Sequence, residues 1–221
     1  MRPTVSVEIW SDVVCPWCYI GKRRFETAVE QLKDEVDIDV VYRPFQLDPT
    51  ASPGVSGPVV DAYAKKFGGP ERANEIIGHV TRVAAEEGLD FHMDIALRAN
   101  TLLAHRALWL AEATGHQLAL KERLLKAYFV DGLDIGDPDT IADCGAEVGM
   151  PRDGMRAFLD STDGVDEVRQ QLAFAAEAEI TAVPTFVLDG RWAVPGAQDA
   201  DTFVTVIRRL VERRAAEDAD A

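Results

Sequence analysis

Two cysteines separated by only two residues carry the most specific chemistry in this sequence. Cys15 and Cys18 enclose Pro16 and Trp17 in the stretch "WSDVVCPWCYIGK". Such a pair can be half of a zinc site, a structural disulfide or a redox-active couple. A structural zinc site takes four ligands, usually from two close pairs, but the third cysteine is distant and the four histidines are scattered. We therefore expect no metal site.

The position of the pair helps to separate the two remaining interpretations. A disulfide between Cys15 and Cys18 closes a very small loop, so it constrains the unfolded chain little. The residues from Thr4 to Trp10 alternate as in a strand, whereas helical periodicity begins at Pro16. Cys15 is therefore expected, exposed, at a helix N-terminus, where unpaired N–H groups and the helix dipole favour a thiolate. Cys18 falls on the apolar stripe one turn later and should be more buried, an arrangement that favours reversible disulfide chemistry.

The elements that position this motif follow from the periodicity of the sequence. A second alternating strand, "VDIDVVYRPF", ends in a loop rich in proline and glycine. Helical periodicity then extends from about residue 59 to residue 178. The stretch "PTFVLDGRWAVPG" predicts a hairpin that turns at Asp189-Gly190, and an amphipathic helix follows from about Ala200. We predict an α/β fold of order β-α-β…β-β-α, from residues 1–58 and 179–215, with an inserted helical domain at 59–178 and a disordered acidic tail at 216–221.

Composition limits the partners and the location. The chain of 221 residues has 38 acidic and 23 basic residues and a formal net charge of −15. This balance disfavours nucleic acid and anionic membrane, since binding to phosphate depends on concentrated lysine and arginine. The sequence contains neither a run of roughly 20 apolar residues nor an export signal, so we expect a cytoplasmic protein without a membrane partner.

Four segments together resemble a known family. They are "SDVVCPWCYIGK", "NTLLAHRA" at 100–107, "ITAVPTFV" at 180–187 and "VPGAQ" at 194–198. In this order, from about Val5 to Arg213, they are similar to the FrnE-like branch of the DsbA family. The resemblance implies a thioredoxin fold with a helical domain inserted between its two halves, and activity in thiol–disulfide exchange. It also implies that Cys15 is the attacking cysteine and Cys18 the resolving one.

The resemblance assigns a second half of the site to the segment around Pro184. An X-Pro bond is usually trans, but the family places a cis-proline here, facing the cysteines. A cis bond would turn the backbone of Val183 outward, where it could pair with an extended substrate. The residues expected to bind substrate are Pro16, Trp17, Val183, Pro184 and Thr185.

Further polar residues leave alternatives open. His105 lies off the apolar stripe of its predicted helix, so it is either solvated or, with Asn100 and Thr101, faces the active site. Asp12 is either a buried proton-relay carboxylate or a local cap at the end of the strand. Cys144 is expected to be a small buried side chain in a helix, with a third redox cysteine as the alternative.

Trp17 either shields the disulfide and touches substrate or packs against the helical domain. Its indole has no proton that titrates near neutrality. We therefore expect Cys15 to be less acidic than in DsbA relatives with histidine at this position.

The leading hypothesis is a thiol–disulfide oxidoreductase acting on protein or small-molecule thiols, with a cellular thiol reductant as partner. It needs no cofactor beyond the Cys15–Cys18 couple, although glutathione could be a co-substrate. One alternative is a glutathione-dependent isomerase or transferase of the kappa-class type, which usually has serine where Cys15 stands. The other is a non-enzymatic chaperone or biosynthetic accessory protein that uses the same cleft. The sequence leaves open the direction of the reaction and whether the chain forms a homodimer.

Overall fold

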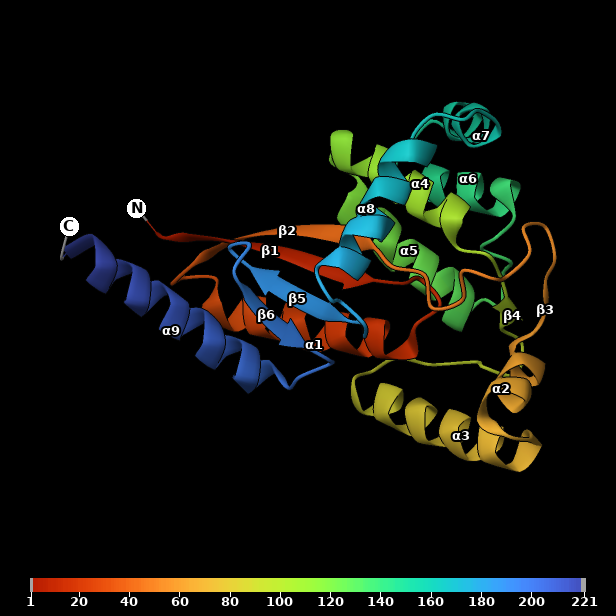
Figure 1. Ribbon diagram of the computed structural model, residues 1–221, viewed down its shortest axis with the longest axis horizontal. Coiled ribbons are helices and arrows are strands. Elements are labelled where there is room, and N and C mark those ends of the chain that lie inside the picture. The colour runs from red at the N-terminus through yellow and green to blue at the C-terminus, as the bar shows by residue number, and fades with distance from the viewer. Residues whose placement is uncertain (1, 220–221) are drawn as a thin grey trace.

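The structure is a computed structural model that describes residues 2–219, and its centre is a four-stranded sheet of order β2-β1-β5-β6 (Figure 1). The strands β1 (Thr4–Ser11) and β2 (Asp37–Pro44) are parallel. The strands β5 (Thr185–Leu188) and β6 (Trp192–Pro195) are antiparallel to each other, and β5 pairs antiparallel with β1. Alternating burial along β1 places its apolar side chains in the core.

Two helices cover one face of this sheet. Helix α1 (Pro16–Leu32) connects β1 to β2, and α9 (Ala200–Ala219) follows β6 and packs beside α1. Phe25 of α1, Phe186 of β5 and Phe203 of α9 form an aromatic cluster with ring centroids 4.5–5.2 Å apart. The predicted order β-α-β…β-β-α is therefore confirmed, and this half has its own hydrophobic core.

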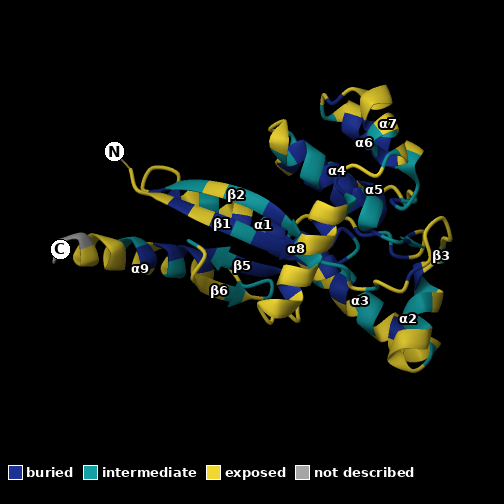
Figure 2. Cartoon of the chain, turned by 45° about the horizontal axis from the view of Figure 1, so that its top comes forward, coloured by how far each residue is buried: buried dark blue, intermediate teal, exposed yellow. Residues whose placement is uncertain are grey.

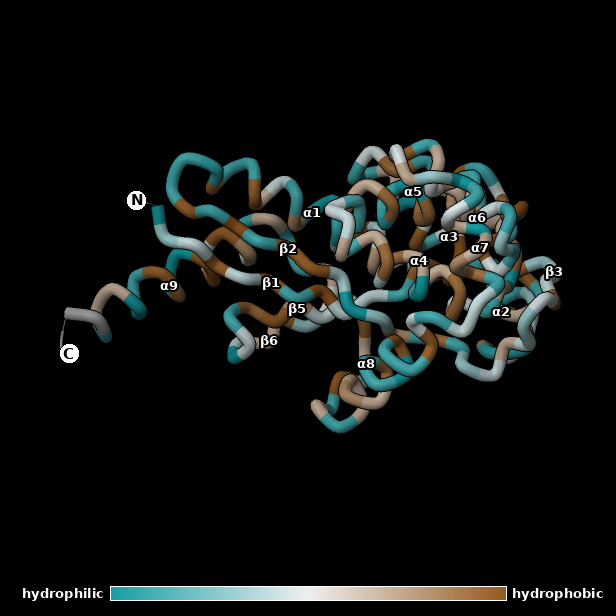
Figure 3. Tube along the Cα trace, turned by 90° about the horizontal axis from the view of Figure 1, so that it is seen from above, coloured by the Kyte–Doolittle hydropathy of each residue, from teal (hydrophilic) through white to brown (hydrophobic). Residues whose placement is uncertain are grey.

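The chain between β2 and β5 forms a helical block. Helices α2 and α3 lie on one side of the N-terminal end of α1, and α4 to α8 lie on the other (Figure 1), and much of the surface of α2, α3 and α8 is exposed (Figure 2). Viewed from above, the sheet with α1 and α9 occupies one half of the molecule and most of the helical block the other (Figure 3). The helices are α2 (Val59–Phe67), α3 (Pro70–Glu86), α4 (Leu102–Ala113), α5 (Gln117–Phe129), α6 (Pro138–Glu147), α7 (Arg152–Asp160) and α8 (Val165–Glu177).

A small ladder was not predicted. β3 (Gly57–Pro58) pairs antiparallel with β4 (Leu97–Arg98) at the entrance to the helical block. Two residues are too few to show the alternation that identifies a strand in a sequence.

The hairpin between β5 and β6 turns where the sequence predicts it. Asp189 and Gly190 have φ of 48° and 64°, the positive values that a tight two-residue turn requires. Asp189 tolerates this conformation with its carboxylate 3.1 Å from both the Ser6 backbone N and an Arg214 guanidinium nitrogen. The turn thus fastens the end of the hairpin to β1 and α9.

The last helix is longer than expected. Helix α9 continues to Ala219, whereas the sequence was expected to lose regular structure after residue 215. Alanine and arginine are good helix formers, and Arg213 and Glu217 form an i,i+4 ion pair of 2.9 Å. Residues 220 and 221 of the expected tail lie outside the described residues. None of the helices within residues 2–219 is long and apolar enough to cross a membrane.

Candidate functional site

Cys15 stands at the point where β1 gives way to α1. Its φ of −88° and ψ of 114° are those of an extended N-cap residue, and Pro16 occupies the first helical position. The Cys15 carbonyl accepts a hydrogen bond of 3.0 Å from the Cys18 backbone N, which places Cys18 one helical turn later. Both are free thiols in the structure. Pro16 is buried, so its position here is that of a helix-starting residue.

The expectation of an exposed Cys15 beside a shielded Cys18 is wrong in this structure. Cys15 is 3% exposed and Cys18 is 2% exposed. Cys15 is covered by a segment from the other end of the chain, because its Sγ lies 3.6 Å from the carbonyl oxygen of Val183. Burial of Cys15 is therefore a tertiary effect that the local pattern does not reveal.

The segment before β5 lies opposite Cys15 and forms the other side of the site. The Val183–Pro184 peptide bond is cis, Pro184 is buried, and its carbonyl accepts a 2.7 Å hydrogen bond from Gly196 N. The Thr185 hydroxyl donates to the Ala182 carbonyl at 2.8 Å. Thr185 was expected to bind substrate, but its hydroxyl is used inside this turn.

Gly21 is a positioning residue that the sequence interpretation missed. A Cβ atom at this position would lie 2.9 Å from Pro184 Cγ and 3.3 Å from the Ala197 Cα. Only a glycine therefore lets α1 approach the Pro184 segment this closely. A glycine in the interior of an amphipathic helix was the signal in the sequence.

Asp12 and His105 form a buried pair behind the cysteines. The two carboxylate oxygens of Asp12 accept hydrogen bonds from Val13 N and Leu47 N, each 2.8 Å long. His105 Nε2 lies 3.2 Å from Asp12 Oδ1 and 2.9 Å from the Phe45 carbonyl oxygen. A carbonyl only accepts, so Nε2 carries a proton that it shares between the two oxygens.

This geometry decides between the alternatives for His105. His105 is 3% exposed, so the interpretation as a solvated histidine is wrong, and it lies against the active-site segment as the second interpretation requires. Asp12 caps the start of α1 and joins it to the segment after β2, and because it is fully buried beside His105, its role as a proton-relay carboxylate stays a prediction.

Asn100 and Thr101 do not join this pair. The Asn100 side-chain amide donates to the Ala51 carbonyl at 2.7 Å and accepts from Leu102 N at 3.0 Å. The Thr101 hydroxyl is 3.4 Å from the side-chain nitrogen of Gln46. Both residues therefore hold the segment that follows β2 against the start of α4.

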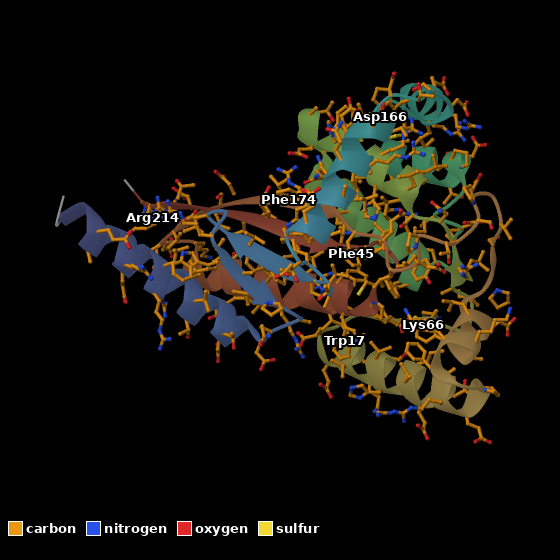
Figure 4. The ribbon with its side chains drawn as sticks, in the orientation of Figure 1. Trp17, Phe45, Lys66, Asp166, Phe174 and Arg214 are labelled. Carbon is orange, nitrogen blue, oxygen red and sulfur yellow. The ribbon has the colours of Figure 1, made fainter. Side chains whose placement is uncertain are left out.

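Trp17 lies between α1 and α3 (Figure 4). Its ring centroid is 6.1 Å from that of His79 in α3, yet the residue is 38% exposed. Trp17 therefore packs against the helical block on one side and presents its other side to solvent beside the pair.

The pKa of each thiol depends on the other because Cys15 and Cys18 lie close together. The hydrogen bond to Cys18 and burial raise the pKa of Cys15 well above that of an ordinary thiol. Burial alone would raise the pKa of Cys18 too, but the hydrogen bond from Cys15 and the charge of Lys121 lower it. The position at the helix N-terminus predicted the more acidic thiol at Cys15. The structure instead favours negative charge on Cys18, because the Cys15 thiol donates to it and the Lys121 ammonium of α5, far away in the chain, adds positive charge.

Lys121 was missed by the sequence interpretation. It is 0% exposed and lies between Leu120 and Glu122 on α5. Its signal was a lysine on the same helical face as Leu124 and Leu125, where an apolar side chain would be expected.

A cavity of about 750 Å³ adjoins the start of α1. Val14 and the aromatic rings of Tyr63 and Tyr128 form part of its wall, and Lys66 on α2 lies at its rim (Figure 4). Burial and the charge of Cys15 raise the pKa of Tyr63 to about 12, so its hydroxyl stays protonated at neutral pH. The volume suits a small ligand or a short peptide segment.

The remaining candidates are the third cysteine, Cys144, and a metal site. Cys144 is buried in α6, and burial raises the pKa of its thiol to about 11, as expected for a small structural side chain. Among residues 2–219 there is no group of three or more histidine, cysteine or carboxylate side chains that could hold a metal ion.

The fold and the cysteine pair together define a class of thioredoxin-like proteins. The sequence profile of the DSBA-like thioredoxin domain family matches residues 6–208, and the chain belongs to this family. It is 31% identical to the uncharacterized protein YwbO of Bacillus subtilis over 206 residues, covering 92% of this chain and 96% of YwbO.

Solved structures have the same fold. The probable DsbA oxidoreductase SCO1869 from Streptomyces coelicolor superposes with a TM-score of 0.85 at 33% identity, covering 93% of this chain and 89% of SCO1869. The cytosolic disulfide reductase DsbM from Pseudomonas aeruginosa superposes with a TM-score of 0.67 at 20% identity, covering 94% of this chain and 98% of DsbM.

Proposed function

We propose that this protein is a thiol–disulfide oxidoreductase in which Cys15 and Cys18 form and break a disulfide. The observation that carries the proposal is the contact of Cys15 Sγ with the carbonyl of Val183, 3.6 Å away, with Cys18 one helical turn behind it. A sulfur atom beside a backbone segment is suited to hold a substrate in a mixed disulfide while the sulfur atoms exchange.

In the oxidising direction, a substrate thiolate attacks Cys15 Sγ of the disulfide and Cys18 leaves as a thiolate. A second substrate thiolate then attacks the substrate sulfur of the mixed disulfide and Cys15 leaves. The substrate is oxidised by two electrons and the pair is reduced. In the reducing direction, Cys15 attacks the substrate disulfide and Cys18 resolves the mixed disulfide. Val183 would pair with an extended substrate, and Trp17 would cover it.

The cavity beside the pair supports a peptide segment or a small thiol as the substrate. Lys65 and Lys66 contribute positive side chains to its wall, which would suit the carboxylates of glutathione, whereas Arg98 there is already paired with Asp48 and Asp61 adds a negative charge. DsbM, which has the same fold, has also been solved with GSH. We extend the proposal to a cytoplasmic protein whose pair is recycled by a cellular thiol such as glutathione.

The proposal is tested by insulin reduction with dithiothreitol or glutathione as the electron source. We expect wild type to accelerate insulin precipitation and the Cys15→Ser variant to fall to the uncatalysed rate, because the attacking thiol is gone. Cys144→Ser is the matched control and should retain wild-type activity, since Cys144 is buried in α6. Equal activity of wild type and Cys15→Ser would refute the proposal and point to a binding role for the cleft.

A further inference from the structure

Three exposed apolar side chains gather at the cavity of about 750 Å³ beside Val14. Leu47, Val55 and Phe67 line this cavity, and each is more than one third exposed. Exposed apolar residues are ordinary when they are scattered, whereas several of them at one hollow indicate a binding site. Leu47 and Val55 belong to the segment after β2, and Phe67 ends α2. These side chains therefore offer apolar surface that a ligand in the cavity would cover.

The wall of this cavity is fixed close to the cysteines. Leu47 N donates to the Asp12 carboxylate at 2.8 Å, which ties the segment after β2 to the start of α1. One residue later, Asp48 accepts a hydrogen bond of 2.8 Å from Arg98 Nε of β4. Residues 52–56 follow and are all exposed. The wall is therefore already formed near α1, so a substrate does not spend binding free energy on ordering it.

The cavity continues past Val55 and Ala99 into a second one. Both residues also line a cavity of about 340 Å³ that reaches Pro138, the first residue of α6. The first cavity starts at Val14, the residue before Cys15, beyond the N-terminal end of α1, where α2, β3 and β4 lie together (Figure 1). The combined space therefore extends from the start of α1 to the start of α6. This extent suits an extended polypeptide segment better than one small thiol.

The charges in the wall of the first cavity nearly balance. Arg98 is paired with Asp48, and Asp61 adds a negative charge to the wall that also contains Lys65 and Lys66. This balance gives little selection between anionic and neutral ligands. Burial of apolar surface should therefore decide which substrate occupies the cavity.

A buried hydroxyl group adds a hydrogen-bond donor to the cavity. Tyr128 of α5 is 1% exposed and lines the cavity, and none of the hydrogen bonds within residues 2–219 involves its hydroxyl. Buried polar groups are normally paired, so an unpaired hydroxyl at a cavity is suited to bind a ligand. Because burial raises the pKa of Tyr128, the hydroxyl stays protonated near neutrality and can donate. The backbone carbonyls of an extended peptide are acceptors of the required kind.

We propose that this cavity selects protein substrates by taking an apolar side chain next to the substrate cysteine, while the Tyr128 hydroxyl donates to a backbone carbonyl of the same segment. This inference rests on the proposed function. When the Cys15 thiolate attacks a substrate disulfide, the bond between Cys15 and the substrate cysteine forms, the substrate disulfide breaks, and the second substrate sulfur leaves as a thiolate. Neighbouring Cα atoms are about 3.8 Å apart, so a residue beside the bound cysteine can reach the cavity that begins at Val14.

Peptide disulfides test this selection. Two symmetric disulfide-linked dimers of a short peptide are compared, one with leucine on both sides of the cysteine and the other with serine. The reduction of bis(2-hydroxyethyl) disulfide is the reference rate for each variant. Wild type should reduce the leucine dimer with a kcat/KM roughly tenfold higher than that of the serine dimer, because burying a leucine side chain is worth at least this factor.

Two matched leucine variants separate the cavity from the rest of the surface. Leu47→Ser should lower the preference for the leucine dimer to about threefold or less, because the cavity loses an apolar contact. Leu118→Ser is the control and should keep the wild-type preference, because Leu118 is an exposed leucine of α5 outside the cavity wall.

Tyr128→Phe tests the hydroxyl and keeps the aromatic ring in place. Relative to the reference rate, kcat/KM should fall about threefold or more for both peptide dimers, because one hydrogen bond is lost. The ratio between the leucine and serine dimers should stay as in wild type, since both dimers have the same backbone carbonyls.

The inference is overturned if Leu47→Ser keeps the full preference, or if oxidised glutathione is a better substrate than the leucine dimer, which would assign the cavity to a small thiol. Failure of the proposed function gives a different result, because wild type would then reduce none of these disulfides. The cavity is then tested by fluorescence anisotropy with labelled peptides in which serine replaces the cysteine. Tighter binding of the leucine peptide, lost in Leu47→Ser, would support the cavity as the selecting site, and equal binding of both peptides would overturn it.

Discussion

His105 and Lys121 are two basic side chains that the fold buries beside the cysteine pair, and they are held in different ways. His105 donates to Asp12 and to the Phe45 carbonyl, so its polar contacts are made inside the protein. Among residues 2–219, the Lys121 ammonium has no hydrogen-bond partner; it lies over the ring of Tyr42 and lines a small space with Ser11. A residue that retains such an unfavourable environment is more consistent with function than with stability.

The stability of the Lys121→Met variant measures how far the buried ammonium group destabilises the folded protein. Because the pKa of Lys121 is lowered to about 8 in the folded state, its protonated form opposes folding at pH 7. We expect Lys121→Met to raise the free energy of unfolding at pH 7 by about 1–3 kcal/mol, measured by urea unfolding of the reduced protein.

The increase in unfolding free energy caused by Lys121→Met should become smaller as pH rises. As pH rises from about 8 toward the unfolded-state pKa, the folded wild type releases the lysine proton before the unfolded chain does. The wild type therefore loses its penalty, and the advantage of Lys121→Met should shrink at pH 9.5. A loss of stability in this variant at pH 7 would show that the ammonium is stabilising.

At the scale of elements, the site depends on the contact of α1 with the segment before β5. Cys15 and Pro184 meet because Gly21 removes the side chain that would hold the two elements apart. Arg24 strengthens the same junction, since it donates to the Ala197 carbonyl at 2.8 Å and pairs with Glu87 at 2.6 Å.

Gly21→Ala should therefore damage both stability and activity. The new Cβ would lie 2.9 Å from Pro184 Cγ, so the Pro184 segment must move. We expect a loss of about 1–3 kcal/mol in unfolding free energy, the typical cost of overpacking, and a fall in insulin-reduction rate. Gly78→Ala in α3 is the matched control, because the nearest atom to its Cβ is the flexible end of Arg82 at 3.8 Å. It should be neutral or stabilising by helix propensity, and equal behaviour of the two variants would contradict the packing argument.

At the scale of the molecule, the sheet half and the helical block meet in a charged network. Glu122 of α5 bonds Tyr19, Lys22 and Arg23, all on α1. Although burial opposes it, the bonds to these groups hold the pKa of Glu122 below its usual value. The junction that places Lys121 near Cys18 is therefore partly electrostatic.

Glu122→Gln should weaken this junction in a pH-dependent way. We expect a loss of about 1 kcal/mol in unfolding free energy at pH 7, a modest value because Glu122 is about one third exposed and water screens its charge. Since the folded-state pKa is lowered, the stabilisation is present above the unfolded-state pKa and is lost as pH falls through the folded-state value. Unfolding curves of variant and wild type should converge once the pH falls below the lowered folded-state pKa of Glu122, and a constant difference would argue against a role for the charge.

Much of the architecture was determined locally by the sequence. The alternation of β1, the proline after Cys15, the helical periodicity of the middle segment and the turn at Asp189-Gly190 each act through neighbouring residues, so they could be recognised without the fold. The same holds for the order of the elements and for the cysteine pair itself.

Only the tertiary structure decided how the two thiols differ. The burial of Cys15 depends on Val183, the cation near Cys18 comes from α5, and His105 reaches Asp12 from α4. These groups are far apart in the chain and act on one another through burial and charge, which fall off with distance in space rather than in sequence. The chemistry of the pair therefore follows from where the helical block is packed against α1.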